Sequence, residues 1–135
     1  MVVNVMNEKT IQLVEKLTTI PSPTGNTYEI IAFIENYLKQ IGYEAKKTNK
    51  GRLMVTVKGI NHQKQQIVTA HLDTLGAMVR AIKPNGRLKL DLIGGFRYNA
   101  IEGEYCTIHT ANRNISGTIL MHQTSVHVYK DAGTA

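Results

Sequence analysis

The hydrophobic pattern of this chain changes at Asp73, and that change constrains the fold more than any other feature of the sequence. Up to Asp73 the apolar residues first recur with the spacing of amphipathic helices and then alternate as they do in strands. Beyond Asp73 no helical spacing recurs, and alternating segments are separated by glycine-containing turns. We therefore predict an α/β domain over residues 1–73 and a β-rich second domain over residues 74–135.

Two helices are predicted in the first part of the chain, over residues 7–20 and 26–41. Asn26 and Glu29 have the spacing of a capping pair at the start of the second helix, and Gly42 can end it. The second helix is apolar on more than half of its circumference, so we expect it to be buried against a sheet.

Strands are predicted at residues 43–48, 52–58, 66–71, 75–82, 87–93, 105–110 and 117–120. The run over 66–71 is apolar and β-branched, which is typical of a buried central strand. The sequence Pro-Asn-Gly at 84–86 predicts the turn of a hairpin. The β-rich part therefore opens with a hairpin directly after the central strand.

The central strand is predicted to present His71 and Asp73 at its end. Side chains at positions i and i+2 of a strand lie on the same face. An imidazole so placed can bind a metal through one nitrogen while the carboxylate orients the ring through the other. Metal chemistry is therefore possible here, but a His-x-Asp triplet alone occurs by chance in many chains and favours a structural histidine.

The other histidines and the serines favour structural roles. His62 lies in a polar loop and His109 lies near a predicted strand, where solvated or packed histidines are commoner than ligands. His122 and His127 would fall on opposite faces of a continuous strand and are poorly placed to share a metal. Ser22 has no base close in sequence, and the chain has no Gly-x-Ser-x-Gly elbow, so a serine nucleophile is not expected.

Composition excludes several classes of protein. The net charge of +6 is dispersed along the chain, and its one basic cluster, at 46–52, has no interleaved aromatic residues, so we expect no nucleic-acid partner. No run approaches about eighteen apolar residues and no signal peptide is evident, so we expect no membrane segment and a cytoplasmic protein. The single cysteine agrees with a reducing compartment.

Two motifs together resemble the M42 family of metallo-aminopeptidases, the glutamyl and deblocking aminopeptidases. They are IPSPTG at 20–25 and HLDTLGAMV at 71–79. The resemblance implies a zinc-peptidase α/β sandwich, interrupted after the His-x-Asp strand by an inserted all-β dimerisation domain. Thr74, Leu75 and Ala77 depart from the residues commoner in the family, which concerns contacts on the substrate side more than the metal chemistry.

The function implied by this resemblance is hydrolysis of the N-terminal residue of a peptide by a water held between two divalent metal ions, zinc or cobalt. His71 matches one metal ligand and Asp73 matches the carboxylate that orients it, whereas the other ligands belong to segments that this sequence lacks. We therefore expect an N-terminal fragment, inactive alone, of an enzyme that takes a peptide substrate. The resemblance also implies a homo-oligomer formed through the β-rich part.

Two alternatives stay open. A second branch of metallopeptidases also has a His-x-Asp motif, but it is typically followed by a valine-proline pattern that residues 74–78 do not share. The chain could instead be a non-catalytic binding or assembly module, or a truncated remnant.

Overall fold

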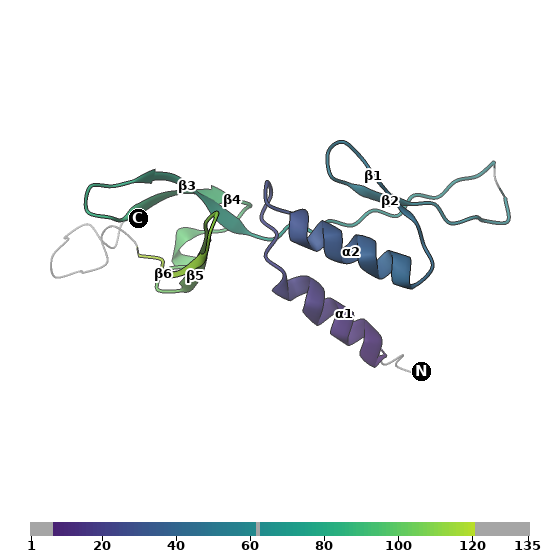
Figure 1. The fold of residues 1–135 in the computed structure, drawn as a ribbon, viewed down its shortest axis with the longest axis horizontal. Coiled ribbons are helices and arrows are strands. Elements are labelled where there is room, and N and C mark those ends of the chain that lie inside the picture. Colours follow the sequence, from purple (N-terminus) through teal and green to yellow (C-terminus); the bar gives the residue numbers. More distant parts are fainter. Residues whose placement is uncertain (1–6, 62, 121–135) are drawn as a thin grey trace. The chain divides into compact units, whose positions relative to one another are not determined.

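The computed structural model describes residues 7–61 and 63–120, and its elements follow the predicted change from mixed to all-β structure (Figure 1). The elements are α1 (Glu8–Thr19), α2 (Tyr28–Gln40), β1 (Ala45–Lys47), β2 (Leu53–Val55), β3 (Gly76–Ile82), β4 (Leu88–Ile93), the 3₁₀ turn η1 (Tyr98–Ala100), β5 (Tyr105–His109) and β6 (Asn114–Thr118). In the described part of the chain, η1 is the only helical element after Asp73 and spans 3 residues. This confirms the absence of a long helix there.

The chain divides into two compact units, residues 1–95 and 96–135. The first unit holds both helices and the hairpins β1–β2 and β3–β4, and the second holds η1 and the hairpin β5–β6. The two units meet after residue 95, and the domain boundary predicted at 73/74 stays a prediction.

Helix α1 begins where the sequence offers a side-chain acceptor. The Asn7 side chain accepts a hydrogen bond from the Thr10 amide at 3.0 Å, which satisfies one of the free amides of the first turn. The helix ends when Ile20 turns extended ahead of Pro21, as expected for a residue that precedes proline.

Helix α2 is confirmed, but the predicted capping pair is wrong. The N-cap residue is Thr27, whose side chain makes no capping bond, and the Asn26 amide instead donates to the Pro23 carbonyl at 2.8 Å. Asn26 therefore belongs to the turn that precedes the helix.

The end of α2 is as predicted. Gly42 has a φ of 86°, a conformation that glycine adopts without strain. Its amide donates to Lys39 at 3.1 Å, and the Tyr43 amide donates to Leu38 at 2.9 Å. These two bonds form a Schellman motif, which satisfies the last carbonyls of the helix.

A small apolar core joins the two helices to the segments around them. Its buried members are Ile20, Ile30 and Ile31. The partly buried residues packed on it are Leu17, Phe33, Ile34, Leu53 and Leu72. Leu72 lies between the two predicted site residues, so the same core that holds α2 also anchors the His-x-Asp segment.

The predicted central strand at 66–71 is wrong for the described structure. Residues 65–72 form no strand, and Ile67 and Val68 are 85% and 95% exposed. A strand requires a neighbour for its amide and carbonyl groups, and β1 and β2 pair only with each other. Apolar β-branched composition shows that a segment suits a sheet but does not supply the partner strand. Helix α2 is also less buried than expected: its buried residues are Ile30 and Ile31, and its C-cap residue Ile41 is half exposed.

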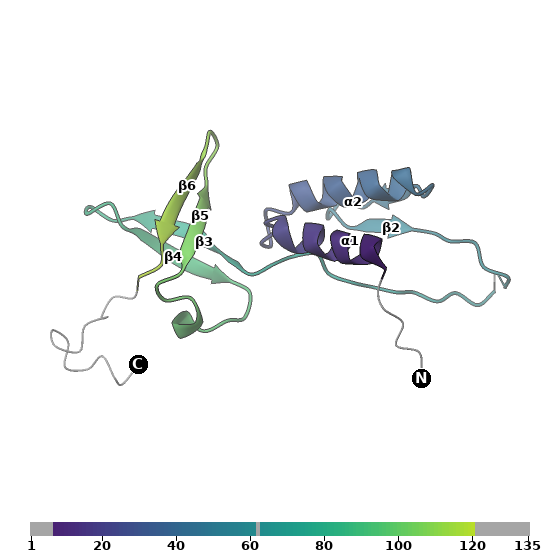
Figure 2. The same ribbon diagram turned by 90° about the horizontal axis from the view of Figure 1, so that it is seen from below.

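The hairpin predicted around residues 84–86 is confirmed as the antiparallel pair β3–β4, and β1–β2 and β5–β6 are antiparallel pairs as well. The pairs β3–β4 and β5–β6 are visible as paired arrows in Figure 2. Gly51 and Gly86, with φ of 78° and 79°, occupy equivalent positions in the turns of β1–β2 and β3–β4. The amide of each glycine donates to the carbonyl three residues earlier and so closes the turn. This is the arrangement of a three-residue hairpin loop that ends with a glycine in the left-handed conformation. Strand β6 lies at Asn114–Thr118, earlier than the predicted 117–120.

No helix in the described ranges, 7–61 and 63–120, combines the length and the apolar character required to cross a membrane.

Candidate active site

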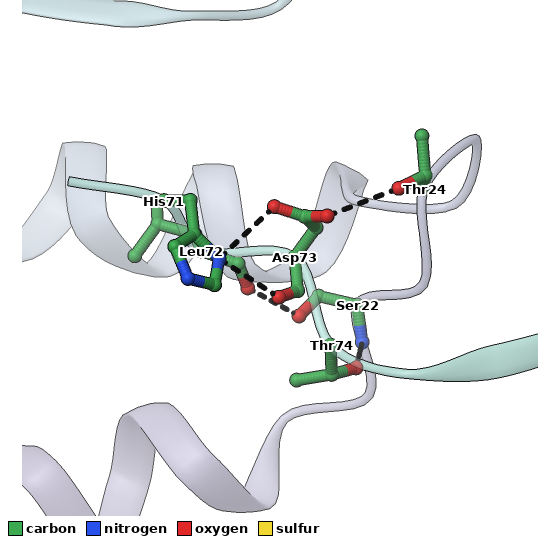
Figure 3. A network of polar contacts seen from close by, with 6 residues as sticks. All are labelled: Ser22, Thr24, His71, Leu72, Asp73 and Thr74. Atoms are coloured by element: carbon green, nitrogen blue, oxygen red, sulfur yellow. Dashed lines mark hydrogen bonds and ion pairs between the residues drawn. The ribbon is translucent and has the colours of Figure 1, made fainter. Parts of the chain in front are cut away.

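The loop around Ser22 is joined to the segment 72–74 by three hydrogen bonds (Figure 3). The Ser22 hydroxyl donates to the Leu72 carbonyl at 2.6 Å, and the Ser22 amide donates to the Thr74 hydroxyl at 3.1 Å. The Thr74 amide donates in return to the Ser22 carbonyl at 3.0 Å. Ser22 is completely buried, so each of its polar groups requires a partner and finds one across this contact.

The composition of the loop explains how it approaches so closely. Pro21 and Pro23 lack amide hydrogens, and their restricted φ keeps the backbone on both sides of Ser22 extended or in a turn. Pro23 forms a parallel bridge with Thr74. A Cβ atom at Gly76 would lie 2.7 Å from the Cβ of Pro23, so glycine is required there.

His71 and Asp73 meet directly in front of this loop. The His71 Nδ1 atom lies 3.2 Å from the Asp73 Oδ1 atom and 3.2 Å from the Asp73 carbonyl oxygen. Both partners are acceptors, so the contacts require a proton on Nδ1, and the neutral ring then carries its lone pair on Nε2. The side chains of His71 and Asp73 are 86% and 48% exposed, which leaves Nε2 accessible to a ligand.

The second carboxylate oxygen of Asp73 is also engaged. The Thr24 hydroxyl donates to Asp73 Oδ2 at 3.1 Å, and Figure 3 shows Thr24 and His71 on opposite sides of the carboxylate. This bond is the main cause that lowers the pKa of Asp73 below its ordinary value. The backbone amide of Asp73 and the neighbouring His71 lower that pKa further, and partial desolvation opposes them. Asp73 is therefore held as a carboxylate, the form that can accept from His71.

The arrangement fits one ligand of a metal site. An imidazole whose Nδ1–H is held by a carboxylate presents Nε2 to a metal with fixed orientation. Within the described residues no group of three or more His, Cys, Asp or Glu side chains converges, so a complete metal site would require further ligands.

The two predicted site residues are thus brought together although the predicted strand is not formed, because the Ser22 loop and the core position of Leu72 fix the segment. Their roles as ligand and orienting carboxylate stay predictions. His109 contacts Asn114 at 3.0 Å within the hairpin β5–β6. His62, His122 and His127 lie outside the described residues.

Sequence reasoning did not predict the contacts that Ser22 and Thr24 make with the His-x-Asp segment. Both belong to the IPSPTG motif, which entered the argument only through its resemblance to a family. Their partners lie 50 and 49 residues away in sequence, so no local pattern could connect them.

Comparison with known proteins identifies relatives of one kind. The profile of the M42 glutamyl aminopeptidase family matches residues 51–135. The chain is 60% identical over 128 residues to the aminopeptidase homologue YhfE of Bacillus subtilis (strain 168). This alignment covers 94% of the chain and 37% of YhfE. It is 26% identical over 98 residues to a glutamyl aminopeptidase of Lactococcus lactis subsp. cremoris (strain MG1363), which covers 72% of the chain and 28% of that protein.

A solved structure has the same fold. The TET aminopeptidase from the marine sediment archaeon Thaumarchaeota archaeon SCGC AB-539-E09 matches 96% of the chain with a TM-score of 0.84, at 21% sequence identity. The match covers 36% of that protein's chain. The chain therefore matches between 28% and 37% of the length of these relatives.

Proposed function

Because the chain belongs to the M42 glutamyl aminopeptidase family, we propose that it forms part of a metal-dependent aminopeptidase that removes N-terminal residues from peptides. The observation that carries the proposal is the contact of His71 Nδ1 with Asp73, which leaves Nε2 of an exposed imidazole available as a ligand. His71 would hold one of two divalent metal ions, zinc or cobalt, and the other ligands would lie outside the described residues. When bound, such ions polarise the scissile carbonyl and lower the pKa of a water molecule.

The described residues contribute orientation to this chemistry. Asp73 accepts the Nδ1–H of His71 and so selects the tautomer that can bind a metal. Leu72 ties the backbone between them to the core, and Ser22 holds the Leu72 carbonyl. A ligand fixed in this way loses less freedom on binding a metal than a mobile one would.

In the same proposal, the mixed part of the chain belongs to an α/β peptidase sandwich and the β-rich part to an inserted dimerisation domain. Two observations support it: the described structure after Asp73 is built of hairpins, and the fold matches that of a TET aminopeptidase. The partners would be a peptide substrate and further copies of the same chain.

One observation favours a second function, a non-catalytic assembly module. Ile67, Val68 and Leu75 are exposed apolar residues, and exposed apolar surface promotes association. We rank this function second because it gives no account of the bonded arrangement of His71, Asp73 and Thr24.

The test is an activity assay on the complete encoded protein. It is incubated with zinc or cobalt and then with peptides that have either a free or an acetylated N-terminus. The proposal predicts release of the first residue from free peptides only, loss of activity with a chelator, and recovery when metal is restored. A folded protein that releases no amino acid with either metal would contradict the enzyme and favour the assembly module.

A further inference from the structure

We propose that Thr24 is a positioning residue for the metal ligand, acting through Asp73 on the His71 ring. The inference rests on the proposed function and extends it to a loop that precedes the His-x-Asp motif in the sequence. Thr24 donates to Asp73 Oδ2 at 3.1 Å, while Asp73 Oδ1 lies 3.2 Å from His71 Nδ1 (Figure 3). The three side chains therefore form one continuous series of contacts.

The physical role follows from the freedom of a carboxylate. The terminal torsion of an aspartate side chain is broad and roughly two-fold, so one hydrogen bond leaves the group able to rotate away. A second bond, to the opposite oxygen, restricts that rotation. With Oδ2 held by Thr24, Oδ1 stays directed at the Nδ1 atom of His71.

The backbone of the loop places the Thr24 hydroxyl accurately. Ser22 is bonded to both Leu72 and Thr74, and Pro23 forms a bridge with Thr74. Thr24 follows directly, so its position relative to Asp73 is fixed by contacts to the same segment that carries the carboxylate. The loop and the ligand segment consequently act as one unit.

A purely structural role for the Thr24 hydroxyl is less consistent with the geometry. Thr24 is exposed, and its bond to Asp73 lies in an exposed region, where such bonds add little to folding. What the bond can change is the orientation of the carboxylate, and through it the ring. An effect on metal affinity and turnover without an effect on folding is therefore the signature of the proposed role.

The experiment compares Thr24→Val, which removes the hydroxyl at nearly constant shape, with Thr24→Ser, which keeps it. Thr107→Val is the matched control, because Thr107 is an exposed threonine of β5. All are made in the complete protein, and Thr24→Ala replaces Thr24→Val if the latter does not fold. Zinc affinity is measured by competition with a chromophoric chelator, and kcat and KM with an unblocked peptide. The tautomer of His71 is read from its ring ¹⁵N shifts in the metal-free protein.

We expect Thr24→Val to weaken zinc binding by up to about 10-fold, the lower end of the effect of removing an outer partner of a ligand. Its kcat should fall with KM nearly unchanged, and the Nδ1–H tautomer of His71 should lose population. Thr24→Ser should restore all three values, and Thr107→Val should match the wild type.

Two failures are distinguishable. A wild-type protein without metal-dependent peptidase activity overturns the proposed function, whatever the variants do. An active wild type combined with a Thr24→Val variant of unchanged zinc affinity, kcat and tautomer overturns the role of Thr24 alone. If Thr24→Ser is impaired as much as Thr24→Val, the loss of the hydroxyl is not the cause of the effect, and the role of Thr24 is likewise overturned.

Discussion

Asp73 takes part in one contact that could be predicted from the sequence and in another that depends on the fold. Its spacing from His71 is local and could be predicted from the alternation of side chains along an extended segment. Its contact with Thr24 spans 49 residues and could not be predicted, because it depends on how the loop after α1 is brought to the segment 72–74. The orienting pair was thus accessible from sequence, and the groups that hold it were not.

The first prediction at this scale concerns the pKa of Asp73. The Thr24 hydroxyl is the largest cause that lowers it from the ordinary value of 3.8, so Thr24→Val should raise it toward that value. Because the pKa of Asp73 is lower in the folded than in the unfolded protein, the ionised side chain stabilises the fold at pH values above its ordinary pKa. This contribution to stability is lost as the pH falls through the folded pKa. The variant should lose the contribution at higher pH than the wild type does.

The measurement is a ¹³C NMR titration of the Asp73 carboxyl carbon in the metal-free protein, with Thr107→Val as control. An Asp73 titration that is the same in Thr24→Val and in the wild type would show that the hydroxyl bond does not persist in solution.

The second prediction concerns Ser22. Replacing the buried Ser22 by alanine leaves the partly buried Leu72 carbonyl without its donor, and an unsatisfied buried polar group costs about 1–3 kcal/mol. Ser22→Ala should therefore lower the free energy of unfolding by that amount in urea denaturation. Ser116→Ala, at an exposed serine of β6, should change it by no more than about 0.5 kcal/mol. Equal effects of the two substitutions would contradict the buried contact.

At the scale of elements, predictability follows the range of the interactions that define each element. Helix α2 ends at Gln40 and is closed by Gly42, and the turn of β3–β4 uses Gly86; the residues that define each feature lie close together in sequence. Both features were predicted because their determinants are local. The strand predicted at 66–71 was wrong because a strand exists only with a neighbour, and the neighbour is not specified by the segment itself.

A third prediction tests how the loop before α2 and strand β3 pack. Gly76→Ala places a Cβ atom 2.7 Å from that of Pro23, closer than two such atoms can approach, so the bridge between Pro23 and Thr74 must open. Gly59→Ala is the control, because a Cβ there meets no atom within 4 Å.

The Gly76 variant should be less stable by about 1–3 kcal/mol, the usual effect of overpacking, whereas the control should be close to the wild type. Thermal or urea denaturation measures both. If the Gly76 variant is as stable as the Gly59 variant, the loop and the strand are not in the close contact described.

At the scale of the whole molecule, the order of mixed and then all-β elements could be predicted from the change of hydrophobic period at Asp73, whereas the α/β sandwich and the inserted domain stay predictions. Burial could not. The buried core comprises Ile20, Ile30 and Ile31, while many large apolar residues of the described chain are exposed. The chain also spans only 37% of YhfE.

A fourth prediction follows from this exposure. A polypeptide of these 135 residues should be catalytically silent. It should also self-associate at micromolar concentration, because exposed apolar surface promotes association. Val68→Lys, at a residue that is 95% exposed, should reduce the association, and Gln66→Lys, at an exposed polar residue of the same segment, should not. Light scattering measures the mass of each. A stable, folded monomer of the unmodified polypeptide would contradict the prediction.

The central claim, that His71 is a metal ligand oriented by Asp73 in an aminopeptidase, is tested most directly by the metal content and peptidase activity of the complete protein carrying His71→Ala or Asp73→Asn. His71→Ala should lose both activity and metal at one site. Asp73→Asn should retain metal and lose about 10–100-fold in activity, since it removes the partner of the ligand rather than the ligand. A His71→Ala protein with wild-type activity and a full complement of metal would contradict the account.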